Sequence, residues 1–108
     1  MNVRVMIVDD HPIVRAGMRT VIESRGFEVV GEAATGEEAV ATASTLRPDV
    51  VLCDLRLGEG IDGVATTAAL RTGAHPPAVI ILTTFDHDAQ IVRAIEAGAA
   101  GYLLKDVS

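Results

Sequence analysis

The sequence predicts an α/β fold in which a parallel sheet is doubly wound, with helices on both of its faces. Three short apolar runs are rich in β-branched residues and do not alternate with polar ones, which is typical of strands covered on both sides. They are residues 3–8, 50–53 and 79–82. Helix-period stretches separate the runs, and a strict alternation of strand and helix implies parallel strands joined by right-handed crossovers.

Two weaker strand candidates, 28–32 and 101–104, bring the predicted sheet to five strands. The first helix is expected to start with His11 as its cap and Pro12 in its first turn, and to end at Gly26. Its apolar residues recur at helical spacing on one face. They are Ile13, Val14, Met18, Val21 and Ile22.

The other three predicted helices carry their own start and stop signals. Thr35 and Glu38 form a capping-box pattern that begins the second helix, and Pro48 lies just past its end. The third helix is expected over 63–71 and the fourth over 86–97. We expect the fourth helix to turn three apolar side chains inward. They are Ile91, Val92 and Ile95.

Length and composition describe one globular domain. The chain has 108 residues, of which 49% are hydrophobic and 22% charged, enough for a single core. A net charge of -6 argues against a surface that neutralises a nucleic-acid backbone, so we expect no nucleic acid to bind through this domain.

Cysteine usage and hydropathy indicate a cytoplasmic protein. The lone Cys53 excludes an internal disulfide and fits a reducing compartment. The apolar run before Asp9 is too short for a signal peptide, and no stretch approaches the roughly 18 apolar residues of a membrane helix. We therefore expect no membrane association.

The chain stops at Ser108, just after the fifth predicted strand. A parallel sheet of this kind needs a further helix to cover one face, and Ser108 would be a good cap for it. We therefore expect the last helix to be missing from this chain. The uncovered apolar face would be exposed, or would be covered by a neighbouring or swapped chain.

Polar side chains follow four of the five predicted strands, at the point where each strand ends. They are Asp9 and Asp10, Asp54, Thr83, and Lys105. In an open parallel sheet these ends meet at one edge. Three carboxylates gathered there would raise one another's pKa unless a hard cation lay among them. Mg²⁺ is the expected ion, because it accepts carboxylate oxygens and is commonly shared with a phosphate.

This set matches a phosphoryl-transfer site, where catalysis is mostly positioning and neutralisation of charge. Asp54 is the expected nucleophile, because it stands alone at the end of the central strand, whereas the adjacent Asp9 and Asp10 suit a metal. Lys105 would offset the phosphoryl charge, and the Thr83 hydroxyl would donate to one phosphoryl oxygen. Taken singly, each residue has an ordinary structural explanation as a turn, cap, strand or surface residue. Four such coincidences at four strand ends make the joint structural explanation poor.

These residues resemble the receiver domain of bacterial two-component response regulators, over the whole chain. The motifs that carry the resemblance are Val8-Asp9-Asp10-His11, Leu52-Cys53-Asp54-Leu55, Thr83 after the fourth strand, and Lys105 in Gly101-Tyr102-Leu103-Leu104-Lys105-Asp106. The resemblance implies a flavodoxin-like sheet of five strands in the order 2-1-3-4-5 and a phosphoacceptor at Asp54. It also implies that Asp9, Asp10, Asp54 and the backbone carbonyl of Arg56 hold Mg²⁺.

The same resemblance implies partners and a switch. A sensor histidine kinase would be the phosphoryl donor, and the domain would assist only its own phosphorylation and dephosphorylation rather than turn over as an enzyme. Residues 82–86 and 101–106 look most like the NarL/LuxR-type branch, whose receivers precede a helix-turn-helix DNA-binding domain that controls transcription. Thr83 would move toward the phosphoryl group and Tyr102 would swing inward. This would reshape the fourth helix and fifth strand and favour a homodimer.

One stretch departs from the family pattern. Residues 58–63 read Gly-Glu-Gly-Ile-Asp-Gly, which lacks the proline of the usual Pro-Gly turn and is one residue longer. The conformation of this loop and the metal geometry at Arg56 are therefore open. The stretch also spells G-x-G-x-x-G, but a dinucleotide site is disfavoured because the motif follows the third strand and because Glu59 and Asp62 would repel a pyrophosphate.

Two further functions compete with the receiver hypothesis. A haloacid-dehalogenase-type phosphatase also uses a nucleophilic aspartate and Mg²⁺, but needs an Asp-x-Asp pattern after its first strand, which Asp9-Asp10-His11 does not supply. A receiver-like interaction module that is never phosphorylated is disfavoured because all the pocket residues are present. The three histidines, His11, His75 and His87, are too scattered for a metal site, and we predict no chemistry for them.

Overall fold

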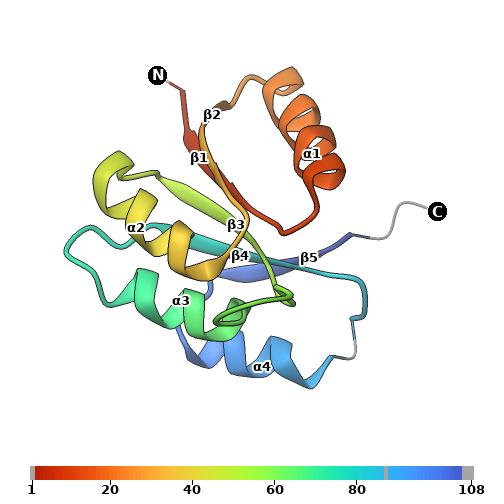
Figure 1. Cartoon of the computed structure of the whole chain (residues 1–108), viewed down its shortest axis with the longest axis vertical. Coiled ribbons are helices and arrows are strands. Elements are labelled where there is room, and N and C mark those ends of the chain that lie inside the picture. Colours follow the sequence, from red (N-terminus) through yellow and green to blue (C-terminus); the bar gives the residue numbers. More distant parts are fainter. Residues whose placement is uncertain (1, 87, 106–108) are drawn as a thin grey trace.

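A five-stranded parallel sheet in the order β2-β1-β3-β4-β5 forms the centre of the computed structural model, which describes residues 2–86 and 88–105 (Figure 1). The strands are β1 (Arg4–Val8), β2 (Glu28–Ala33), β3 (Val50–Asp54), β4 (Ala78–Thr83) and β5 (Gly101–Leu104). The helices are α1 (Pro12–Ser24), α2 (Gly36–Leu46), α3 (Gly63–Arg71) and α4 (Ala89–Glu96). The predicted flavodoxin-like fold and strand order are confirmed.

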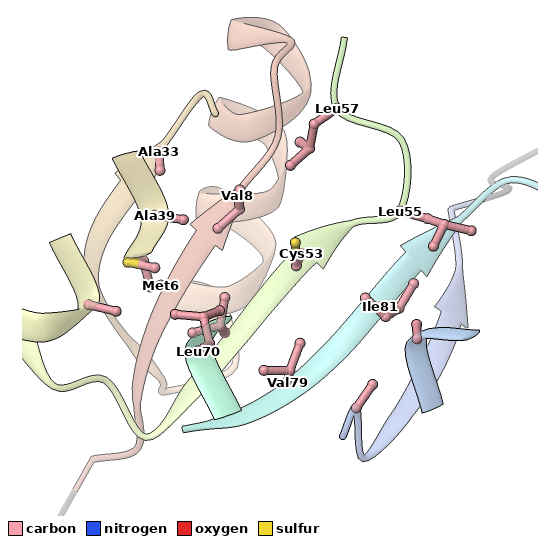
Figure 2. Close-up of a cluster of buried hydrophobic side chains, with 14 of the residues drawn as sticks. Met6, Val8, Ala33, Ala39, Cys53, Leu55, Leu57, Leu70, Val79 and Ile81 are labelled. Carbon is pink, nitrogen blue, oxygen red and sulfur yellow. The ribbon is translucent and has the colours of Figure 1, made fainter. Parts of the chain in front are cut away.

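The main core lies between the sheet and the row formed by α2, α3 and α4. Alternate residues of β1, β3 and β4 point into it, as the period of two in a strand requires (Figure 2). They include Met6, Val8, Val51, Cys53, Val79 and Ile81, all fully buried. Small residues on α2, such as Ala39, let that helix pack close to the sheet.

The opposite face of the sheet is only partly covered. Helix α1 lies on it, apart from the other three helices (Figure 1), and has no fully buried residue. Beside it runs an apolar groove of about 620 Å³. Its lining includes Met18 and Val21 of α1, Leu52 of β3, Leu82 of β4 and Leu103 of β5. The apolar residues of α1 therefore border a groove rather than a closed core.

The start of α4 differs from the prediction. The helix begins at Ala89 rather than at residue 86, because the Asp88 side chain accepts the Gln90 amide proton and so caps it. Ile91 is buried as expected, but Val92 is 62% and Ile95 43% exposed. An eight-residue helix that packs on α3 buries only a narrow stripe, and Ala94 is its second buried residue.

Other helix ends agree with the sequence patterns more closely. The Glu38 amide donates to Thr35 Oγ1 at 3.1 Å, which confirms the predicted cap of α2. His11 precedes α1 but makes no side-chain cap hydrogen bond, and Pro12 occupies the first turn. His87, and Ser108 as the predicted cap of a further helix, lie outside the described residues.

Gly63 allows α3 to start directly against the backbone that follows β3. A Cβ atom at Gly63 would lie 2.5 Å from the Asp54 carbonyl oxygen and 2.7 Å from Leu55 Cα. We expect Gly63→Ala to lower the free energy of unfolding by about 1–3 kcal/mol, because backbone atoms must move to make room. Urea denaturation measures this change.

Gly73→Ala is the matched control, because its Cβ would meet nothing closer than the Leu70 carbonyl oxygen at 3.7 Å. Its free energy of unfolding should stay within about 0.5 kcal/mol of wild type. Equal stability of the two variants would contradict the close approach at Gly63.

Candidate metal centre at the carboxyl edge of the sheet

The sheet brings the predicted strand-end residues together at its carboxyl edge. Parallel register places Val8 beside Cys53, Asp54 beside Leu82, and Thr83 beside Leu104, so the strand ends are level. Asp9 is fully buried, and Asp54 and Thr83 are only 6% and 4% exposed. Burial of several polar groups at one edge indicates a built site rather than a solvated surface.

Lys105 joins two buried carboxylates, those of Asp9 and Asp54. Its Nζ donates to Asp9 Oδ2 at 3.0 Å and to Asp54 Oδ2 at 3.2 Å. Its backbone amide donates to the Thr83 carbonyl at 2.7 Å, which extends the β4 and β5 pairing to the site. The side chain is 19% exposed, so the three charges interact in a partly water-excluded environment.

Burial raises the pKa of the Asp54 carboxyl above its usual value, and nearby Asp9 adds to the rise while the Lys105 ammonium opposes it. Burial alone would lower the pKa of Lys105, but its hydrogen bond to Asp9 and the charge of Asp54 raise it overall. Lys105 is therefore held in its charged form. Lys105 lowers the pKa of Asp54 but does not fully offset the effect of burial.

Carboxylate oxygens offer a place for that extra charge. Ligand atoms of Asp9, Asp10, His11 and Asp54 all lie within 4.8 Å of one another. Asp10 Oδ1 is buried and, among the described residues, accepts no well-directed hydrogen bond; the nearest basic atom is His11 Nδ1 at 2.9 Å. A buried oxygen in this condition, next to two other carboxylates, fits a hard divalent cation such as Mg²⁺.

His11 belongs to this cluster, although the sequence analysis predicted no chemistry for it. Its backbone amide donates to Asp9 Oδ1 at 2.8 Å, and its Nδ1 lies 2.9 Å from Asp10 Oδ1. The sequence signal for His11 is its position directly after Asp10, rather than its spacing from the other histidines. His75 is not part of the described cluster.

Two arginines contact the site from neighbouring segments, Arg15 through its side chain and Arg56 through its backbone amide. Arg15 of α1 donates from Nη1 to the Asp9 carbonyl at 2.6 Å and from Nε to Glu32 of β2 at 3.1 Å, which fixes the end of β1.

The backbone amide of Arg56 lies 3.4 Å from Asp54 Oδ1. Its guanidinium reaches across to Asp88. The role of the Arg56 carbonyl as a metal ligand stays a prediction.

The loop over 58–63 is tied to two carboxylates. The Gly58 amide donates to Asp10 Oδ2 at 3.1 Å, and the Ile61 amide donates to Glu37 Oε2 at 3.0 Å. Gly60, between them, has a φ of 76°, which favours glycine. Asp62 caps α3 through the Ala65 amide, so the helix start already has an anionic partner. This adds to the case against a dinucleotide site, whose pyrophosphate would need that position.

The two predicted switch residues occupy different places. Thr83 is buried, and its Oγ1 accepts the Phe85 amide proton at 3.3 Å. Tyr102 is 43% exposed on β5. The structure brings Thr83 to the carboxyl edge and leaves Tyr102 outside it.

Cys53 lies fully buried next to the site, where burial and the charge of Asp54 raise the pKa of its thiol to about 12.

Comparison with known proteins identifies close relatives of this arrangement. The family model described as the response regulator receiver domain matches residues 5–108. The response regulator protein VraR of Staphylococcus aureus is 41% identical over 109 residues, which cover 100% of this chain and 52% of that protein. The chain therefore spans about half the length of such curated relatives.

Solved structures agree with the sequence matches. A LuxR-family two-component response regulator from Aurantimonas sp. SI85-9A1 superposes with a TM-score of 0.91 at 40% identity, over 100% of this chain and 77% of that one. The signal receiver domain of the putative response regulator NarL from Mycobacterium tuberculosis has a TM-score of 0.88 at 40% identity, over 99% and 86% of the two chains. Within residues 2–86 and 88–105, every helix is too short or too polar to cross a bilayer.

The raised pKa of Asp54 predicts a stability that depends on pH. A raised pKa means that the folded state binds this proton more tightly than the unfolded state, so the Asp54 contribution to stability falls as the pH rises above 3.8. In metal-free buffer we expect Asp54→Asn to have a higher Tm than wild type at pH 7. Thermal unfolding from pH 4 to 8 should show the difference shrinking toward pH 4.

Addition of Mg²⁺ should make the wild type more stable than Asp54→Asn at pH 7, because the ion stabilises the ionised carboxylate, which only the wild type has. A variant that is less stable than wild type in metal-free buffer at every pH would contradict the raised pKa.

The cluster also predicts that Mg²⁺ stabilises the folded protein. A ligand at about a hundredfold excess over its Kd adds about 2.7 kcal/mol to the free energy of unfolding. We expect Asp10→Asn to lose this gain, because it removes one of the three clustered carboxylates. Glu59→Gln, which removes an exposed carboxylate from the nearby loop, should keep it. Titration calorimetry and thermal unfolding measure both, and an unchanged Kd in Asp10→Asn would exclude the cluster as the site.

Proposed function

Because this chain belongs to the response regulator receiver domain family, we propose that it is a phosphoacceptor switch that takes a phosphoryl group on Asp54. The observation that carries the proposal is the sharing of Lys105 Nζ between Asp9 and Asp54 at a buried strand edge. One cation for two buried carboxylates leaves a local excess of negative charge, and a phosphoryl group needs a metal to enter such a place.

Each residue would have a definite part in the transfer. An Asp54 carboxylate oxygen would attack the phosphorus and form a new P–O bond. The bond between the phosphorus and the donor would break, and its electron pair would stay with the donor. Asp9, Asp10, Asp54 and the Arg56 carbonyl would hold Mg²⁺, which when bound neutralises charge on the phosphoryl oxygens. Lys105 already lies beside Asp54 and would donate to one of the phosphoryl oxygens.

Thr83 would transmit the effect of phosphorylation from Asp54 to the surface of the domain. Its hydroxyl now makes a local contact with the Phe85 backbone, and donation of its proton to a phosphoryl oxygen would replace that contact. The loop after β4 would then shift with it, and Tyr102 on the neighbouring strand could turn toward the space left behind. The resulting change in the surface of α4 and β5 would favour a homodimer.

The partners follow from the family and from the relatives. We propose a sensor histidine kinase as the donor, a cytoplasmic location, and no turnover chemistry beyond the phosphorylation and dephosphorylation of Asp54 itself. One relative of known structure is a DNA-binding response regulator of the LuxR family from Staphylococcus aureus. The full-length protein would therefore join this receiver to a helix-turn-helix output domain, with a further helix after β5 over the apolar groove. Nucleic acid would bind only through the output domain.

Incubation with Mg²⁺ and acetyl phosphate tests the acceptor. Intact-mass measurement should show the gain of one phosphoryl group in wild type and in Glu59→Gln, and none in Asp54→Asn. Lys105→Met should slow the reaction by about 100-fold, the order expected from removing one donor at the developing charge.

The same experiment separates the competing functions. Continuous release of phosphate from varied esters would favour the haloacid-dehalogenase-type phosphatase. A wild-type protein that takes up no phosphoryl group with any donor would favour the unphosphorylated interaction module and overturn the proposal.

A further inference from the structure

We propose that the ion pair between Arg56 and Asp88 couples the phosphoacceptor to the first turn of α4, and that a phosphoryl group on Asp54 breaks this pair. The inference rests on the proposed function, because it needs a charge to arrive at Asp54. It adds a second connection to α4, carried by Arg56 rather than by Thr83.

The contact is well formed on both sides. Nη2 and Nε of Arg56 donate to Asp88 Oδ2 at 2.7 and 3.1 Å. The other oxygen, Asp88 Oδ1, accepts the Gln90 amide proton at 2.9 Å and caps α4. Both oxygens of the Asp88 carboxylate therefore accept hydrogen bonds, one from the loop after β3 and one from α4. These hydrogen bonds from Gln90 and Arg56 also lower the pKa of Asp88, which stays ionised.

Helix α4 depends on its cap more than a longer helix would. It has eight residues, and only Ile91 and Ala94 are buried. Its described packing is chiefly against α3. Because short helices gain their stability from packing and from capping, the loss of a hydrogen bond at Asp88 should destabilise the whole of α4.

Arg56 touches the acceptor with its backbone and α4 with its side chain. Its amide lies 3.4 Å from Asp54 Oδ1, while its side chain is 69% exposed, so the guanidinium has room to turn toward another anionic group. Phosphorylation would replace the single negative charge of the Asp54 carboxylate by roughly two on the phosphoryl group, and it would bring three acceptor oxygens to a position two residues away. A guanidinium binds a phosphoryl group through two parallel hydrogen bonds, whereas it now meets a single oxygen of Asp88. The new group should therefore draw Arg56 away from the helix.

Amide hydrogen exchange over residues 89–96 tests the coupling in the unphosphorylated protein. Arg56→Gln removes the guanidinium, and Asp88→Asn removes the charge but keeps an oxygen that can cap Gln90. Each variant should raise the exchange rates of α4 about two- to fivefold, the range for an exposed ion pair. The double variant should exchange no faster than either single one. Arg93→Gln, which removes an exposed arginine from α4 itself, should leave the rates unchanged.

The second arm adds Mg²⁺ and beryllofluoride, which mimics a phosphoryl group on an aspartate. Wild-type α4 should then exchange about as fast as the variants do without it, whereas the variants should change little. Additive effects of the two substitutions, or wild-type exchange that stays slow with beryllofluoride bound, would overturn the coupling. If mass and fluorine NMR measurements show that Asp54 takes up neither acetyl phosphate nor beryllofluoride, the proposed function fails instead.

Discussion

The shared ammonium of Lys105 is the interaction on which the rest of the site depends. Asp9, Asp54 and Lys105 are 45 to 96 residues apart in the chain, yet one Nζ atom lies within 3.2 Å of both carboxylates. This is possible only because β1, β3 and β4 end level with one another and β5 closes the edge beside β4. The buried like charges in turn favour a divalent cation at this edge, and they mean that the proposed phosphoryl group would change the local balance of charge.

The strand-end residues could be predicted because they follow from the fold itself. Apolar runs gave the strands, and parallel strands must finish at a common edge, so Asp9, Asp54, Thr83 and Lys105 had to meet. The start of α4 could not be predicted in the same way. Both Asp86 and Asp88 are good helix caps, and the choice between them depends on how the loop crosses the edge of the sheet. The reach of Arg56 to Asp88 and of Arg15 to the Asp9 carbonyl depends on side-chain directions that no spacing rule expresses.

The glycine-rich loop after β3 is held in place by carboxylates of two other segments. Two of its amides are anchored, one on Asp10 and one on Glu37. The first anchor uses an oxygen of a proposed metal ligand, so the loop and the cation would share the same carboxylate. A glycine-rich sequence suits this arrangement because its backbone can approach the carboxylates closely and can adopt the positive φ seen at Gly60.

Cys53 has a practical consequence for work on this protein. It is the one cysteine of the chain, it is fully buried, and the pKa of its thiol is raised to about 12. Thiol-reactive dyes attack the thiolate, so they should leave this residue untouched in the folded state. A second cysteine placed at an exposed position such as Val92 would then be the single labelled site. The native protein therefore offers a background on which a fluorescent reporter can be attached to α4 without first removing a cysteine.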